Sequence, residues 1–251
     1  MGILSLSGIK KHFGGFWVLD GIDMDIEAGK MHQLIGSNGS GKTTLINVIS
    51  GLIKPDEGKV VFDGVDITQK GPYETFKTGL VRTWQIPQAF KNLTTMENFL
   101  VSSEHNSGES YMYAPLKPKW KGDEEKIMDR AIEVMKMVNL LEKRDILSQN
   151  LSGGQQKLLE LGRALMSDAK MILMDEPIAG VNPTLAHEIF EMIRDICVKQ
   201  KITFLIVEHR LDISLQYVEH VLMTANGKIL VEGDPQEVIK HPNVVESYLG
   251  E

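Results

Sequence analysis

A glycine-rich segment near the N-terminus, GSNGSGKTT, has residue types and spacing that can hold phosphate groups. Gly36 and Gly41 are followed by Lys42 and Thr43, which fits G-x-x-x-x-G-K-[ST] between an apolar strand and a helical pattern. Glycines let the backbone wrap closely around phosphate oxygens, so that N–H groups and the positive end of the next helix face the anion. The residues predicted to contact a nucleotide here are Gly36, Ser37, Asn38, Gly39, Ser40, Gly41, Lys42, Thr43 and Thr44.

The end of this segment suits the charged part of a nucleoside triphosphate. Lys42 supplies a positive charge to the β and γ phosphates. Thr43 offers a hydroxyl to Mg²⁺, a hard ion that prefers oxygen ligands and arrives with the nucleotide. The segment therefore predicts a nucleotide site with Mg²⁺.

Two adjacent carboxylates follow an apolar run in MILMDEP, at the carboxyl end of a predicted central strand. Asp175 is predicted to hold Mg²⁺, usually through water. Glu176 is predicted to orient the attacking water or accept its proton. Together with the phosphate-binding segment, the pair indicates hydrolysis rather than binding alone.

A second candidate anion site lies at LSGGQ, residues 151–155, directly before the helical pattern QKLLELGRALM. Its hydroxyl and backbone N–H groups stand at a helix N-terminus, where anions are stabilised. The residues predicted to contact nucleotide here are Ser152, Gly153, Gly154 and Gln155.

The elements that must position these residues alternate between strands and helices. Strand-like runs occur at ILSLS, MHQLIG, KVVFDG, LVRTWQ, MILMDEP, ITFLIVEH and HVLMTANGKILVEG. This alternation predicts an α/β core with a mostly parallel sheet, and Asn226-Gly227 predicts a two-residue hairpin. VLDGIDMDI and KVVFDGVDI predict a small antiparallel β subdomain near the N-terminus.

We expect a single domain over residues 1–251 with an insertion. Residues of about 1–88 and 166–251 form the α/β core with its β subdomain, and about 89–165 form a helical subdomain. Residues of about 104–124 are poor in aliphatic side chains and contain two prolines. They indicate a mobile surface loop or, alternatively, an element that contacts a partner.

Composition limits the classes of function. A net charge of −7 and a pI near 5.6 leave no broad basic surface, so nucleic acid is not an expected partner. The single cysteine, Cys197, excludes an internal disulfide and suits a reducing compartment. No apolar run approaches the ~20 residues that span a bilayer, and the N-terminus lacks signal-peptide regions, so we expect a chain that does not cross a membrane by itself.

Taken together, the motifs resemble an ABC transporter ATPase. GSNGSGKTT, Gln85 in VRTWQ, LSGGQ, MILMDEP and His209 in IVEH occur in the order of that family, over essentially the whole chain. The resemblance implies an α/β fold of the P-loop NTPase class, ABC type, and ATP hydrolysis coupled to transmembrane transport. It also implies a head-to-tail dimer, with an identical or a related chain, in which each ATP lies between one phosphate loop and the other chain's LSGGQ.

The resemblance also implies roles for residues that the sequence alone would not single out. Phe13 matches the position of an aromatic ring that stacks on adenine, with Phe16 and Trp17 as close rivals. Gln85 matches a glutamine that reaches Mg²⁺ and the attacking water, and His209 matches a histidine that contacts the γ-phosphate.

Two positions depart from the family pattern. Ser37 stands where proline is frequent, and Asn182 stands where many relatives have aspartate. Asn182 keeps the hydrogen bonding of that aspartate but loses its charge.

Within the family, VRTWQIPQAF, AGVNP and the ending ESYLGE look most like ATP-binding subunits of branched-chain amino acid importers. Such a subunit lies in the cytoplasm on the inner face of the membrane, against integral membrane permeases, and works indirectly with an extracytoplasmic solute-binding protein. The alternatives are an export ATPase of the lipopolysaccharide-extracting type and a soluble ABC protein without a transporter. The latter usually carries two cassettes or a long coiled-coil insertion, and this chain has neither.

Overall fold

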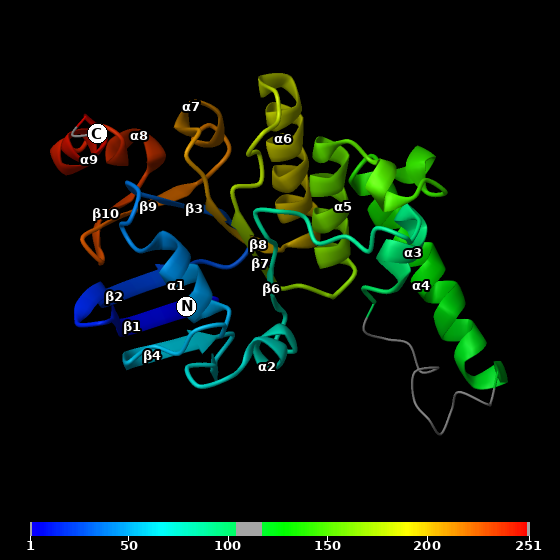
Figure 1. Ribbon diagram of the computed structural model, residues 1–251, viewed down its shortest axis with the longest axis horizontal. Helices are drawn as coiled ribbons and strands as arrows, with labels where there is room; N and C mark the ends of the chain where they lie inside the picture. Colours follow the sequence, from blue (N-terminus) through cyan, green and yellow to red (C-terminus); the bar gives the residue numbers. More distant parts are fainter. Residues whose placement is uncertain (1, 104–116, 250–251) are drawn as a thin grey trace. The chain divides into compact units, whose positions relative to one another are not determined.

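The computed structural model describes residues 2–103 and 117–249 (Figure 1). The chain forms two compact units, each built from segments that are separated in sequence. The first contains Met1–Gln85, Lys170–Ala179 and Ala186–Glu251, and the second contains Ile86–Ala169 and Gly180–Leu185.

The N-terminal part of the first unit forms an antiparallel sheet with the strand order β2-β1-β4-β5. Its strands are β1 (Leu4–Phe13), β2 (Phe16–Ile26), β4 (Glu57–Phe62) and β5 (Val65–Asp66). Buried and exposed residues alternate along much of β1 and β2, as expected for strands with one face on a core. The predicted antiparallel β subdomain is therefore present.

The second sheet of this unit has the order β10-β9-β3-β8-β7-β6. Its strands are β3 (Met31–Ile35), β6 (Leu80–Arg82), β7 (Met171–Asp175), β8 (Thr203–Val207), β9 (His220–Ala225) and β10 (Lys228–Gly233). All neighbours pair in parallel except β9 and β10. Asn226 and Gly227 join those two strands with φ of 51° and 72°, the left-handed values that such a hairpin requires. The predicted α/β class and the predicted hairpin are both confirmed.

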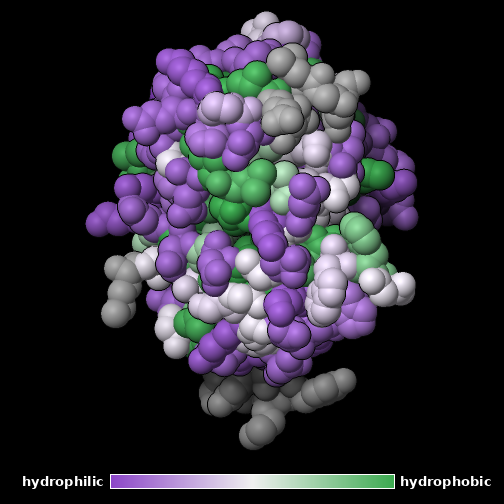
Figure 2. Space-filling view, turned by 90° about the vertical axis from the view of Figure 1, so that its left-hand side faces the viewer, coloured by the Kyte–Doolittle hydropathy of each residue, from purple (hydrophilic) through white to green (hydrophobic). Residues whose placement is uncertain are grey.

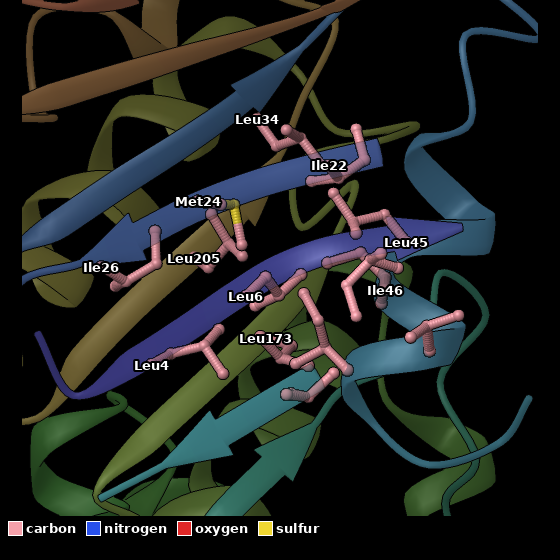
Figure 3. Packing of buried hydrophobic residues seen from close by; sticks show 14 of the residues in the cluster. Leu4, Leu6, Ile22, Met24, Ile26, Leu34, Leu45, Ile46, Leu173 and Leu205 are labelled. Atoms are coloured by element: carbon pink, nitrogen blue, oxygen red, sulfur yellow. The ribbon is translucent and has the colours of Figure 1, made fainter. Parts of the chain in front are cut away.

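The core of the first unit lies between its two sheets (Figure 3). Leu4, Leu6 and Met24 of the antiparallel sheet pack with Leu173 and Leu205 of the parallel sheet. One face of α1 (Lys42–Ile49) packs into the same cluster. Because each fully buried side chain of this kind contributes about 1.5–3 kcal/mol, this cluster fixes the sheets that carry the site. The helices of this unit are α1 (Lys42–Ile49), α2 (Pro72–Phe76), α6 (Pro183–Gln200), α7 (Leu211–Ser214), α8 (Pro235–Val238) and α9 (Pro242–Leu249). Of α6, the residues from Ala186 onward belong to this unit.

The second unit is helical. It contains α3 (Thr95–Leu100), α4 (Lys117–Met137), α5 (Gly153–Leu165) and the 3₁₀ turns Leu141–Lys143 and Ser148–Asn150. Phe99 of α3 is fully buried against Gly162 of α5, where an added Cβ would lie 2.4 Å from the ring. Gly162 therefore permits the close approach of the two helices.

The start of α4 corrects the predicted loop over residues 104–124. Residues 117–124 are helical, although Pro118 had suggested a loop, because proline is tolerated in the first turn of a helix. Residues 104–116 lie outside the described part of the chain.

Cys197 on α6 is buried, and its thiol takes part in no disulfide. Burial is the main reason that the pKa of this thiol rises to about 11. The thiol therefore stays protonated at neutral pH, in keeping with a small buried hydrophobe.

His32 on β3 makes the free energy of unfolding depend on pH. Its ring is 1% exposed, its Nε2 lies 3.1 Å from the Glu27 carbonyl oxygen, and its Nδ1 has no partner among the described residues. Burial is the main reason that the pKa of His32 falls to about 4, from an ordinary value of 6.5. Between these values the unfolded chain binds a proton that the folded chain does not. The free energy of unfolding therefore falls as pH drops through this window.

We expect wild-type protein to lose about 2 kcal/mol of unfolding free energy between pH 7 and pH 5 through this group. His32→Gln can still donate to the Glu27 carbonyl but has no proton to gain, so its loss should be smaller by about that amount. Urea unfolding of both proteins at the two pH values measures the difference. Equal losses would contradict the assignment to His32.

Candidate nucleotide site

The glycine-rich loop connects the end of β3 to the start of α1. Gly36, Gly39 and Gly41 have φ of 152°, 77° and 100°, which side chains rarely adopt. A Cβ on Gly36 would lie 2.3 Å from the Thr224 carbonyl oxygen, and one on Gly41 would lie 2.9 Å from that of Val18. Glycine is thus required at both positions by conformation and by space.

Lys42 points its ammonium group back into this loop. Its Nζ donates to the carbonyl oxygens of Gly36 at 2.7 Å and Ser37 at 2.8 Å, and the residue is buried. Both acceptors are neutral, whereas phosphate oxygens are charged and make stronger hydrogen bonds to an ammonium group. A bound phosphate can therefore compete for Lys42.

A cavity of about 210 Å³ lies over the start of α1. It is lined by Val18, Asn38, Gly39, Gly41, Lys42, Thr43, Thr44, Asp175, Glu176, Val207 and His209. Pockets that enclose a whole small ligand usually measure roughly 300–1,000 Å³, so this cavity would receive only part of a nucleotide. The carboxyl ends of β7 and β8 thus bring the predicted carboxylates and His209 to the phosphate loop.

Some predicted residues of the loop support the cavity without lining it. The Ser40 hydroxyl is buried and lies 3.0 Å from Thr224 Oγ1, which itself donates to the Ile35 carbonyl oxygen. Gly36 and Ser37 likewise do not line the cavity in this structure. The Ser40 side chain holds the loop against β9, a role that the motif did not indicate.

Glu176 stands in a left-handed conformation, with φ of 50°, directly after β7. Its backbone N–H donates to the Val207 carbonyl oxygen at 2.9 Å. Gln85 Nε2 donates to Glu176 Oε2 at 2.6 Å, and His209 Nε2 lies 3.4 Å from Oε1. Positive φ in a non-glycine residue clusters at functional sites because the surroundings must impose it. The structure therefore brings Gln85, Glu176 and His209 together.

Asp175 has a neighbour that sequence reasoning missed. Arg82 Nη2 lies 3.4 Å from Asp175 Oδ2, and both side chains are largely buried. Burial lowers the pKa of Arg82, and the Asp175 carboxylate opposes that change. The only available signal was a basic residue inside the strand-like run LVRTWQ.

The three aromatic candidates for stacking lie around the β1–β2 turn. Phe13, Phe16 and Trp17 are 49%, 71% and 41% exposed, and Phe13 pairs with Phe16 across the turn. None of them lines the cavity, although Val18, which follows Trp17 on β2, does. Figure 2 views the left-hand side of Figure 1 and shows a mostly hydrophilic surface with apolar residues gathered near its middle. The exposed rings of Phe13, Phe16 and Trp17 are available for a ligand.

The LSGGQ segment starts α5 in the second unit. Ser152 caps the helix: its hydroxyl accepts from Gln155 N at 3.3 Å, and Gln155 Oε1 accepts from Ser152 N at 2.9 Å. Gly153 is exposed with open space around its Cβ position, whereas a Cβ on Gly154 would lie 2.3 Å from Leu185 Cδ2. The two glycines thus differ: Gly153 leaves the helix start open, and Gly154 allows packing.

Asn182, the second departure from the family pattern, has a local role. Its Oδ1 accepts a hydrogen bond from Leu185 N at 2.9 Å, close to the start of α6. Asparagine can cap a helix as aspartate does, so the missing charge leaves this function intact.

The model of the family described as ABC transporter matches residues 19–179. The chain is also 46% identical over 250 residues to a probable branched-chain amino acid transport ATP-binding protein, LivG, of Archaeoglobus fulgidus, covering 100% of this chain and 96% of that protein. The chain belongs to the ABC transporter family. The corresponding LivG of Methanocaldococcus jannaschii is 48% identical over 255 residues, with 100% and 98% covered.

Solved structures agree with this membership. A nucleotide-free ATP-binding cassette from an ABC transporter has a TM-score of 0.85 to this chain, and an ADP conformation of such a cassette has 0.87. Both are 46% identical, with 100% of each chain covered. The predicted ABC-type fold and the predicted ATPase class are therefore confirmed.

Two kinds of feature are absent from the described residues. None of the described helices is both long and apolar enough to cross a membrane. The same residues contain no group of three or more His, Cys, Asp or Glu side chains placed to hold a metal ion. A metal held mainly by phosphate and water would not need such a group.

Proposed function

We propose that this chain is the ATP-binding and ATP-hydrolysing subunit of an importer of branched-chain amino acids. The observation that carries the proposal is the cavity in which the phosphate loop, the carboxylates after β7 and His209 after β8 meet. Full-length similarity to proteins named for branched-chain amino acid transport supports the substrate class. The same names favour amino acid transport over the lipopolysaccharide-extracting alternative.

Binding uses the phosphate loop. Backbone N–H groups of the loop and the start of α1 face the β and γ phosphates, and Lys42 exchanges its two carbonyl partners for phosphate oxygens. Phe13 offers its exposed ring to adenine, with Phe16 and Trp17 as the other candidates.

The donor set around the cavity fits Mg²⁺. Thr43, Gln85 and Asp175 supply a hydroxyl, an amide oxygen and a carboxylate, all oxygen ligands that this ion prefers. When bound, Mg²⁺ would neutralise part of the charge that develops on the β and γ phosphates. Arg82 compensates the Asp175 carboxylate in the present structure.

Hydrolysis uses Glu176. A water oxygen attacks the γ-phosphorus, the bond from that phosphorus to the bridging oxygen breaks, and the water proton passes to Glu176 Oε2 or Oε1. Gln85 holds the carboxylate from one side through its 2.6 Å hydrogen bond, and His209 lies on the other side. His209 and Lys42 stabilise the negative charge on the γ-phosphate during this step. The products of the hydrolysis are ADP and inorganic phosphate.

The helix start at Ser152 completes the site from a second chain. Ser152, Gly153, Gly154 and Gln155 present a hydroxyl, N–H groups and the positive end of α5, which suit the γ-phosphate of a head-to-tail partner. The small volume of the cavity agrees with a site that one chain only half encloses. The partner is an identical or a related ATPase subunit.

Outside the dimer, the proposed partners are integral membrane permeases on the inner face of the cell membrane. An extracytoplasmic solute-binding protein acts indirectly, because it delivers the amino acid to the permeases. One solved relative, 25% identical with a TM-score of 0.83, is described as part of an ABC transporter complex. The chain itself then lies in the cytoplasm as a peripheral protein.

Reconstitution tests this function. We expect ATP hydrolysis by the chain, joined to its permeases and binding protein in liposomes, to rise several-fold with leucine, isoleucine or valine. Such a rise corresponds to about 1 kcal/mol of activation free energy. Glutamate and lipopolysaccharide serve as comparison additions. Stimulation by lipopolysaccharide alone would favour the export alternative, and stimulation by ribosomes or DNA without permeases would favour the soluble alternative.

A further inference from the structure

Glu208 is a buried carboxylate that the proposed hydrolysis does not use. It follows β8 directly, is 3% exposed, and does not line the cavity. Burying a charged group costs free energy unless hydrogen bonds compensate it. The partners of this carboxylate therefore indicate its role.

The described donors to the Glu208 carboxylate are backbone N–H groups of two loops. Oε1 accepts from His209 N at 2.9 Å and from Arg210 N at 3.2 Å. Oε2 accepts from Ile178 N at 3.5 Å, a long hydrogen bond that the carboxylate charge strengthens. Ile178 lies two residues after Glu176, so one side chain connects the loop of Glu176 to the loop of His209.

A second set of buried contacts holds the His209 loop at its other end. Gln33 Nε2, on β3, donates to the Glu208 carbonyl oxygen at 3.3 Å and to Ser214 Oγ at 2.8 Å. Ser214 Oγ in turn donates to the Arg210 carbonyl oxygen at 3.1 Å. The loop is therefore fixed on both sides of His209, and the Glu208 carboxylate ties it to the backbone of the Glu176 loop.

We propose that Glu208 is a positioning residue that fixes the Glu176 loop and the His209 loop relative to each other. This inference rests on the proposed function, because it assigns both loops to hydrolysis. Glu176 and His209 are only 3.4 Å apart, so a small displacement of either loop changes the geometry at the attacking water. ATP affinity depends mainly on the phosphate loop, which Glu208 does not contact in the described structure.

Glu208→Gln tests the proposal, because glutamine has nearly the same side-chain volume as glutamate. The amide removes the charge and places an NH₂ group where a carboxylate oxygen now accepts hydrogen bonds. We expect kcat for ATP hydrolysis to fall about tenfold, equivalent to one lost hydrogen bond to a charged group. The Kd for ATP, measured by titration, should stay within about twofold, because the phosphate loop is unchanged.

Glu219→Gln is the matched control. Glu219 also accepts a backbone hydrogen bond, from Met31 N at 2.8 Å. Met31 is the first residue of β3, at the end of the strand away from the phosphate loop. The Glu219→Gln variant should keep the wild-type kcat. The Tm of Glu208→Gln and of Glu219→Gln shows whether loss of stability alone explains a change in kcat. If Glu208→Gln does not fold, Glu208→Asp keeps the charge but cannot reach the same donors, and its kcat should fall at least about threefold.

The outcomes separate this proposal from the proposed function. If the wild-type chain hydrolyses ATP and both Glu208 variants have the same kcat as wild type, only the positioning role is overturned. An equal loss of kcat in Glu219→Gln, or a matching loss of ATP affinity in Glu208→Gln, would also overturn it. Failure of the wild-type chain to hydrolyse ATP, alone and with its permeases, would contradict the proposed function itself.

Discussion

Glu176→Gln should bind ATP normally and hydrolyse it about 10²-fold more slowly than wild type, or slower still. The amide cannot take the proton from the attacking water, whereas its oxygen can still accept the hydrogen bond from Gln85 that now measures 2.6 Å. Lys42 and the glycine-rich loop are unchanged, so the phosphates keep their contacts. With hydrolysis blocked, ATP should hold two chains together as a stable dimer.

Phosphate release at saturating ATP, titration of ATP and gel filtration measure the three properties. Glu191→Gln, at an exposed position of α6, is the control for loss of a carboxylate without loss of the proton acceptor. Hydrolysis by Glu176→Gln near the wild-type rate would show that another group accepts the proton.

Gly153→Asp should abolish both ATP-driven dimerisation and hydrolysis. The position is exposed, and a Cβ added there has no neighbour within 4 Å. An aspartate in the first turn stabilises a helix, so the fold should be kept or slightly stabilised. The same negative charge repels a γ-phosphate that approaches the helix start from another chain, which should lower turnover by about 10²-fold or more.

Gly153→Ala is the matched control, because it adds a Cβ without charge. It should keep most of the activity, whereas changes at Gly154 would be ambiguous because a Cβ there meets Leu185 at 2.3 Å. Tm and binding of ATP to the single chain should match wild type in Gly153→Asp. Normal hydrolysis by this variant would exclude Gly153 from the site.

Local sequence patterns predicted the parts of the site that are formed by residues adjacent in the sequence. The glycine spacing and the apolar run before Asp175 lie within single strand-to-helix or strand-to-loop junctions, so the sequence shows them directly. The same holds for the Asn226-Gly227 hairpin, since left-handed turn residues have few alternatives.

Contacts between distant segments could not be predicted in this way. Arg82 meets Asp175, and Glu208 meets Ile178, only because parallel strands bring their carboxyl ends to one edge of the sheet. Gln85 was singled out only through the family resemblance, and its contact with Glu176 spans 91 positions. The helical start of α4 was missed because polar composition alone does not exclude a helix.

The central claim is that each ATP is held by the phosphate loop of one chain and the LSGGQ segment of the other. A mixed dimer tests it most directly, with Gly153→Asp in one chain, Lys42→Ala in the other and Glu176→Gln in both to stop hydrolysis. Head-to-tail pairing gathers both defects into one site and leaves the other intact, so one ATP per dimer should remain bound after gel filtration. Placing both defects in the same chain should spoil both sites and leave none. The reverse pattern, no ATP with separated defects and one with combined defects, would contradict the claim, because it would show that LSGGQ serves the phosphate loop of its own chain.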